Sequence, residues 1–128
     1  MKNKNFLNWH CLKKKIHESP KSLYFHEREI WFCSLGLNVG YEQDGWHNNF
    51  ERPVLILKKF NQRIFLAIPL TSKNKKGKYY YQFTYKNKKY SAILSQLRLL
   101  DSKRLSRKIR VLPKLDFEII KKGIKKLI

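Results

Sequence analysis

The sequence predicts a mainly β fold of the α+β class: a small antiparallel β-barrel with a helix at each end of the chain. Short β-prone runs separated by turn residues indicate the barrel, and apolar residues at spacings of three and four indicate the helices. The chain has 128 residues, 42% hydrophobic and 14% aromatic, which suffices for one core. We expect residues 1–27 to form a helical extension and linker, and residues 28–128 to form the barrel domain.

The first helix is expected over residues 3–17, where Phe6, Trp9, Leu12 and Ile16 recur at helical spacing. We expect this apolar face to dock on the domain. The alternative is a basic amphipathic surface for a membrane or RNA, because lysines occupy the other faces of the helix. The polar stretch around Pro20 is interpreted as a linker.

The expected strands are short, with turn residues between them, and cover residues 29–34, 53–58, 63–70, 78–85, 90–94 and 108–112. Val54 to Leu57 is a continuous apolar run, which is typical of a core strand. A helical turn capped by Asp101 or Ser102 is expected before the last strand.

The second helix is expected from Pro113 to the end of the chain. Its apolar stripe consists of Phe117, Ile120, Ile124 and Leu127. Acidic residues lie early in this segment and lysines late, in agreement with the helix dipole. The expected fold therefore closes with an amphipathic helix.

The net charge of +20 predicts a polyanionic partner: nucleic acid, an acidic membrane surface or an acidic protein. A generally basic proteome is the alternative explanation. Cys11 and Cys33 have no metal-site or disulfide spacing, so we expect separate thiols, no metal and no cofactor. No apolar run is long enough to span a membrane, and we expect a cytoplasmic protein without membrane contact.

Chemically useful groups gather at the ends of two apolar runs. Arg52 precedes Pro53 at the start of one, and residues 64–70 form the other, which leads into Thr71-Ser72-Lys73. If these runs pair as strands, a guanidinium, a carboxylate, two hydroxyls and a lysine come together, and that set suits a phosphate. The alternative for Arg52 is a strand-end ion pair with Glu29, Glu42 or Glu51.

An ordered series of segments resembles the MazF/PemK (Kid) family of toxin endoribonucleases. The segments are Arg28-Glu29-Ile30-Trp31, Gly40-Tyr41-Glu42-Gln43, Arg52-Pro53-Val54-Leu55-Ile56, Pro69-Leu70-Thr71-Ser72-Lys73, Ile93-Leu94-Ser95-Gln96-Leu97-Arg98 and Asp101-Ser102-Lys103-Arg104-Leu105, followed by the amphipathic helix. Residues 44–51 form a longer insertion than is usual in this family, and the N-terminal helix is an addition to it.

The resemblance implies an SH3-like barrel, a homodimer, and cleavage of single-stranded RNA at short motifs without a metal. It also implies neutralisation by an acidic antitoxin. By resemblance, the catalytic residues are Arg52, Thr71 and Glu42. The expected RNA-binding residues include the Gln-x-Arg pair and the basic loop, and are Gln43, Trp46, Ser72, Lys73, Lys75, Lys76, Gln96 and Arg98.

In the expected reaction, the 2′-OH of the substrate attacks phosphorus and leaves a 2′,3′-cyclic phosphate and a 5′-OH end. Arg52 suits charge stabilisation. Thr71 either contacts the phosphate or merely forms a turn, and Glu42 either accepts the proton or only orients Arg52. Trp46 either stacks a base or pins the loop. We expect His47 to be a solvated loop residue.

Two other functions remain open from the sequence. One is a non-catalytic, gyrase-poisoning protein of the CcdB-like kind on the same barrel. The other is a basic RNA-binding module without chemistry. Arg52 and Thr71 at strand ends favour the endoribonuclease, because a pure protein-binding toxin needs neither residue.

Overall fold

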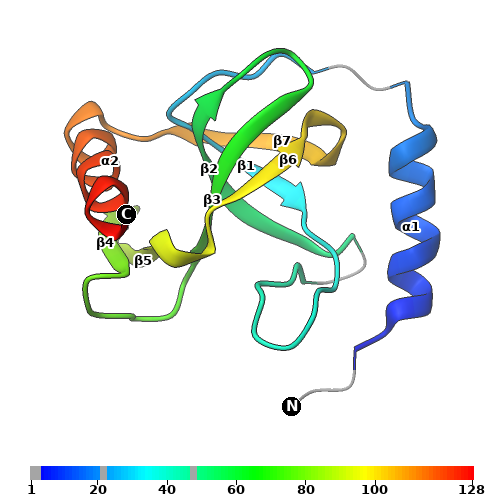
Figure 1. Ribbon diagram of the computed structural model, residues 1–128, viewed down its shortest axis with the longest axis horizontal. Helices are drawn as coiled ribbons and strands as arrows, with labels where there is room; N and C mark the ends of the chain where they lie inside the picture. Colours follow the sequence, from blue (N-terminus) through cyan, green and yellow to red (C-terminus); the bar gives the residue numbers. More distant parts are fainter. Residues whose placement is uncertain (1–3, 21–22, 47–48) are drawn as a thin grey trace.

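Two helices flank a curled antiparallel sheet in the computed structural model, which describes residues 4–20, 23–46 and 49–128 (Figure 1). In chain order the elements are α1 (Phe6–Glu18), β1 (Glu29–Ser34), β2 (Glu51–Lys59), β3 (Ile64–Thr71), β4 (Tyr80–Tyr85), β5 (Lys88–Ile93), the 3-10 turn η1 (Leu94–Gln96), β6 (Arg98–Asp101), the 3-10 turn η2 (Ser102–Arg104), β7 (Leu105–Val111) and α2 (Lys114–Leu127).

The sheet runs in the order β4-β5-β3-β2-β1-β7, and β6 pairs with β3 outside this path. Every pairing between these strands is antiparallel. Strand β3 pairs with β5 at one end and β6 at the other, so the sheet curls around it. The sheet forms a half-barrel, and this mainly β fold with a helix at each end confirms the expected small antiparallel barrel class.

Strand β2 is buried on both faces. Val54 and Ile56 pack with Phe25 and Phe65 in one apolar cluster, whereas Leu55 packs with Ile120 in the other. Successive side chains of a strand point to opposite faces, so a strand between two clusters must be apolar at every position. The continuous run from Val54 to Leu57 follows from that position and confirms the expected core strand.

Helix α2 covers one face of the sheet with Phe117, Ile120 and Ile124, all buried, as the apolar stripe predicts. The hydroxyl of Tyr81 in β4 donates a hydrogen bond of 2.5 Å to Asp116 Oδ1 at the start of this helix. A hydrophobic face and one polar contact therefore fix α2 to the sheet.

The region between β5 and α2 differs from the expectation. Residues 98–101 form β6, where no strand was expected, and β7 begins at Leu105, three residues before the expected strand. Strand β6 has only four residues, and both strands find their pairing partners far away in the chain, so local pattern reveals neither β6 nor the start of β7. Asp101 caps the turn η2 by accepting a hydrogen bond from Lys103 N, which confirms the expected cap.

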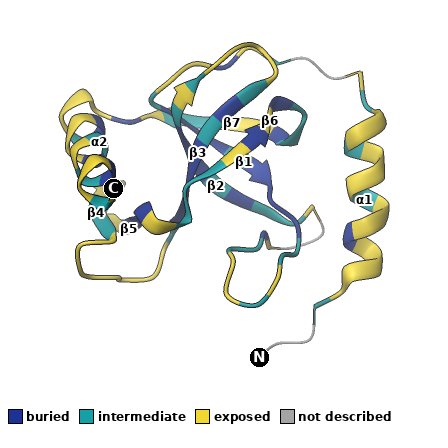
Figure 2. Cartoon of the chain, in the orientation of Figure 1, coloured by how far each residue is buried: buried dark blue, intermediate teal, exposed yellow. Residues whose placement is uncertain are grey.

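Helix α1 contacts the domain through a narrower face than expected. Trp9 is buried, but Leu12 and Ile16 are only half-buried and Phe6 is exposed. Figure 2 shows the helix as largely exposed, standing on the side of the sheet opposite α2. Within the described residues, no helix is both long and apolar enough to cross a bilayer.

Candidate active site

Arg52 lies near the start of β2, where its side chain is only 5% exposed. Strands β2 and β3 pair with Val54 opposite Pro69 and Leu55 opposite Ile68. The same antiparallel register, continued by two residues, brings Arg52 level with Thr71, the last residue of β3. The two residues predicted to share a phosphate site are therefore neighbours on paired strands.

Two backbone carbonyls hold the Arg52 guanidinium. Its Nε donates to Asp44 O at 2.6 Å, and its NH1 group donates to Leu70 O at 3.0 Å. Burial lowers the pKa of Arg52, and the nearby Asp44 carboxylate opposes part of that shift. An arginine with a lowered pKa still carries its charge at neutral pH, so the site contains a fixed cation.

The indole of Trp46 covers this cation. Its ring centroid lies 5.6 Å from Arg52 Cζ, within the range of a cation–π contact. Trp46 is 45% exposed, so the other part of its surface faces solvent. The indole therefore packs on the guanidinium, and base stacking by its exposed part stays a prediction.

A cavity of about 160 Å³ opens beside Arg52. Its lining brings together five predicted site residues, Trp46, Arg52, Thr71, Ser72 and Lys73, and adds three that were not predicted as site residues, Pro53, Leu70 and Tyr90. Thr71 Oγ1 accepts a hydrogen bond of 3.2 Å from Lys73 N, so its own hydroxyl hydrogen remains available as a donor. The cavity can thus present a guanidinium and a hydroxyl to one anion.

The lysine-rich loop after β3 is anchored to the sheet. Ser91 Oγ donates to Lys73 O at 3.0 Å and accepts from Lys75 N at 3.2 Å. Gln82 Nε2 donates to Lys75 O at 2.9 Å. The side chains of Lys73, Lys75 and Lys76 stay exposed. The backbone of this loop is therefore held by the sheet, while its charged side chains stay exposed beside the cavity.

Glu42 is placed differently from the other predicted catalytic residues. Its side chain is exposed, and Oε1 accepts a hydrogen bond of 3.0 Å from Val39 N within its own loop. Glu42 is not among the described residues that line the cavity. Asp44, two positions later, provides the carbonyl that Arg52 uses. The structure therefore does not bring Glu42 to the guanidinium.

Gln43, Gln96 and Arg98 are not among the described residues that line the cavity. Gln96 Oε1 accepts from Gln43 N at 3.2 Å, and Gln96 Nε2 donates to Tyr41 O at 3.2 Å, so this amide braces the loop around Glu42. Arg98 is half-buried in β6, opposite Ala67 of β3. These contacts make Gln96 a support for the loop, in addition to its predicted role in RNA binding.

The sequence did not indicate Tyr90 as a site residue. The sequence pattern placed Tyr90 in a strand. Only the pairing of Thr71 with Ser91 shows that this strand passes beside the cavity. His47, which we expect to be a solvated loop residue, lies outside the described residues. Within residues 4–20, 23–46 and 49–128, no group of three or more His, Cys, Asp or Glu side chains is arranged to hold a metal ion.

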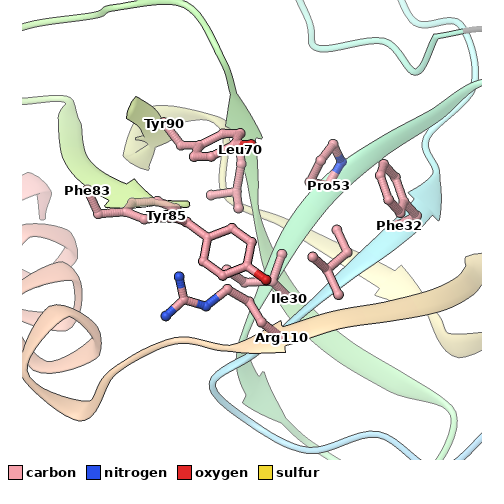
Figure 3. Close-up of a pocket in the computed structure, with 9 residues that line it drawn as sticks. Ile30, Phe32, Pro53, Leu70, Phe83, Tyr85, Tyr90 and Arg110 are labelled. Atoms are coloured by element: carbon pink, nitrogen blue, oxygen red, sulfur yellow. The ribbon is translucent and has the colours of Figure 1, made fainter. Parts of the chain in front are cut away.

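A second cavity of about 110 Å³ adjoins the first and shares Pro53, Leu70 and Tyr90 with it. Its lining is mostly apolar and aromatic. Figure 3 shows Tyr85 and Tyr90 on one side and Phe32 and Pro53 on the other. The guanidinium of Arg110 lies 4.1 Å from the Tyr85 ring centroid. A flat, apolar group with a polar edge would fit between these walls.

Comparisons with solved structures find the same fold in other proteins. A MazF crystal structure (Form-I) from Deinococcus radiodurans has a TM-score of 0.69 at 19% identity, covering 82% of this chain and 96% of that one. An endoribonuclease in complex with its cognate antitoxin, from a mycobacterial species, has a TM-score of 0.60 at 12% identity, covering 80% and 93%. The Mycobacterium tuberculosis toxin MazF-mt6 has a TM-score of 0.60 at 16% identity, covering 77% and 94%.

The sequence itself gives a family match. A comparison with curated proteins finds no match. Residues 26–128, however, match the family described as PemK-like, MazF-like toxin of type II toxin-antitoxin system. This range begins after α1 and its linker and includes both Arg52 and Thr71. The protein therefore belongs to the PemK-like, MazF-like family of toxins of type II toxin–antitoxin systems.

Proposed function

We propose that this protein is an endoribonuclease toxin that cleaves single-stranded RNA, such as messenger RNA, at short sequence motifs without a bound metal. The observation that supports the proposal most directly is the shared cavity of Arg52 and Thr71. A buried cation and an available hydroxyl at one small site are the groups that a phosphodiester needs when no metal stabilises its charge. Family membership supports the same function.

Arg52 binds the scissile phosphate in this proposal. A guanidinium has five N–H donors, and the carbonyls of Asp44 and Leu70 take two of them. Arg52 lines the cavity, and in this proposal its remaining donors hold two phosphate oxygens. Because the guanidinium is fixed before substrate arrives, little reorganisation is needed as negative charge grows on the pentavalent phosphorus.

The reaction forms a bond between the substrate's 2′ oxygen and phosphorus and breaks the bond between phosphorus and the 5′ oxygen. The 2′-OH loses its proton, and the leaving 5′ oxygen gains one. The products are a 2′,3′-cyclic phosphate and a 5′-OH end. Thr71 donates its hydroxyl hydrogen to a non-bridging oxygen, while its Oγ1 continues to accept from Lys73 N.

Glu42 has a supporting role in this proposal. Because it is exposed and bonded to Val39 N, we assign it to ordering the loop that presents Asp44 and Trp46. A Glu42→Gln variant should then keep most of its cleavage rate. A loss of about 100-fold would restore the proton-accepting role predicted from the family resemblance.

The substrate is single-stranded in this proposal because the adjoining aromatic cavity can take an unpaired base next to the bound phosphate. Bases stacked on aromatic side chains contribute roughly 1–3 kcal/mol each. Trp46 offers a second aromatic surface beside Arg52. In this proposal the exposed side chains of Lys73, Lys75 and Lys76 contact phosphates along the RNA backbone.

The partners follow from the same reasoning. We propose an acidic antitoxin that neutralises this highly basic chain, a homodimeric toxin and a cytoplasmic location. One of the similar structures is described as an endoribonuclease in complex with its cognate antitoxin. We also propose that residues 28–128 are the catalytic domain and that residues 1–27 are an extension to it.

The test is cleavage of a long single-stranded RNA in EDTA by wild type and by Arg52→Ala, with chemical mapping of the ends. We expect cuts at a recurring short motif, cyclic phosphate and 5′-OH ends, and loss of cleavage in the variant. Circular dichroism checks that the variant is folded. Binding without cuts in both proteins would contradict the proposal and favour a non-catalytic RNA-binding or gyrase-poisoning function.

A further inference from the structure

Lys4 joins the N-terminal extension to the loop that precedes β2. Its ammonium group forms an ion pair with Asp44 Oδ2 at 2.9 Å and also donates to the carbonyl oxygens of Asn38 and Gly40, the latter at 3.3 Å. The Lys4 side chain is only 11% exposed. A lysine that is nearly buried with three oxygen partners occupies a specific site, unlike the solvated lysines elsewhere on the surface.

Asp44 links this lysine to the candidate active site. Its side chain binds Lys4 through Oδ2 and accepts a hydrogen bond of 2.6 Å from Asn38 N through Oδ1. Its backbone carbonyl accepts from Arg52 Nε at 2.6 Å. One residue therefore contacts Lys4 on one side and Arg52 on the other, and the three residues form a continuous polar chain.

Trp9 provides a second attachment of α1 to the same loop. Its ring packs against Phe50 with centroids 5.6 Å apart and lies 5.8 Å from the guanidinium carbon of Arg104. It covers Gly36 so closely that a methyl group on that residue would overlap the indole. Gly36 and Phe50 are joined by a backbone hydrogen bond of 3.2 Å. Trp9 thus closes the base of the loop.

We propose that the N-terminal extension positions Arg52, with Lys4 as the positioning residue acting through Asp44, and Trp9 anchoring α1 at the loop base. This inference rests on the proposed function and adds to it a role for residues outside the family match. Without Lys4, the Asp44 carboxylate loses its ion-pair partner, and the loop loses a contact that holds the Asp44 carbonyl against Arg52. A small displacement of a catalytic group lowers the rate more than it weakens substrate binding.

The test compares three full-length variants in the cleavage assay: Lys4→Met, Lys4→Arg and Lys14→Met. Lys14 is exposed on α1, so its replacement removes the same charge without touching the loop. We expect Lys4→Met to lower kcat about tenfold, with KM within about twofold of wild type. Lys4→Arg should recover most of the rate, because its guanidinium can still pair with Asp44. Lys14→Met should behave like wild type.

A second measurement separates this inference from the proposed reaction. Solvent exchange of the Arg52 Nε–H, followed by NMR, reports its hydrogen bond to Asp44 whether or not RNA is cleaved. We expect exchange about tenfold faster in Lys4→Met and unchanged in Lys14→Met. If wild type does not cleave RNA but the exchange rate responds as expected, the proposed RNA cleavage is wrong, whereas the positioning of Arg52 by Lys4 is supported. Equal exchange in wild type and Lys4→Met would overturn the positioning role.

Discussion

Arg52 lies beneath Trp46 with its guanidinium held by two carbonyls. The sequence predicted the neighbourhood of this residue well, because an arginine before a proline at the start of an apolar strand and a threonine at the end of the next one need only strand pairing to meet. The sequence could not predict Asp44 O or Tyr90 as its surroundings. Every residue has a backbone carbonyl, so the sequence does not indicate which carbonyl binds Arg52. Tyr90 is brought near by the pairing of β3 with β5, two strands that are distant in the chain.

Replacement of Thr71 by Val removes the hydroxyl and keeps the side-chain shape. If Thr71 donates to a phosphate oxygen as charge develops, kcat for RNA cleavage should fall about 100-fold, with KM changed by less than about threefold. Steady-state cleavage of a short RNA checks this. Thr84→Val, on the exposed part of β4, is the matched control. A normal rate in Thr71→Val would leave this residue with only its turn-forming bond to Lys73 N.

Glu29 gives a prediction about acid stability. Burial raises the pKa of this carboxyl, but hydrogen bonds from Trp31 and His26 N and the ion pair with Lys108 Nζ at 3.0 Å outweigh burial, so the pKa lies below its ordinary 4.5. Its stabilisation is therefore present above about pH 4.5 and is lost as pH falls through the lowered pKa.

At neutral pH, Glu29→Gln should lower the free energy of unfolding by about 1 kcal/mol, because the ion pair with Lys108 is lost. At a pH below the pKa of Glu29 in the folded protein, wild type and variant should be equally stable. Urea unfolding across pH measures both. Glu118→Gln serves as the control, since that carboxylate is exposed and pairs only with Lys121 on α2 among the described residues. A stability difference that does not change with pH would contradict the prediction.

Among the elements, those with a continuous pattern were predictable. Strand β2 is apolar from Pro53 to Leu57 because both of its faces are buried there, and α2 shows its stripe because one face is buried. Strand β6 was missed because four residues are too few to show a period, and it exists through its pairing with β3. For α1, the spacing predicted a face of four apolar residues, but only Trp9 is buried in the domain.

Tyr81→Phe tests the attachment of α2. Burial and the hydrogen bond to Asp116 raise the pKa of Tyr81 to about 12. The neutral hydroxyl is thus favoured in the folded state, and its stabilisation is present below the ordinary pKa of 10.0 and lost as pH rises toward 12. At neutral pH the variant should lose about 1 kcal/mol of unfolding free energy.

Urea unfolding and hydrogen exchange of the α2 amides check this prediction, with exchange expected to accelerate first in the turn around Asp116. Tyr79→Phe is the control, because that residue is 44% exposed just before β4. Similar stability of Tyr81→Phe and wild type at neutral pH would show that apolar packing alone holds α2.

Across the whole molecule, the net charge of +20 predicts salt-sensitive RNA binding, but the charges are not equivalent. Lysines 73, 75 and 76 stand on an anchored loop beside the cavity, whereas lysines 122, 125 and 126 lie exposed on α2. Replacing the first three by Gln should reduce the slope of log Kd against log salt by about 2. The same change to the α2 lysines should leave the slope nearly unaltered. Equal effects of the two triple variants would indicate attraction by net charge alone.

The close packing of Trp9 on Gly36 constrains how this protein can change over evolutionary time. While the indole covers position 36, no side chain fits there, and the backbone φ of 75° adds a second reason for glycine. In a lineage that loses the N-terminal helix, the indole no longer excludes a side chain at position 36. Only the positive φ then restricts this position, and Asn tolerates that conformation. Among relatives, tryptophan at position 9 should therefore occur with glycine at position 36, and chains lacking the helix should be the ones with other residues there.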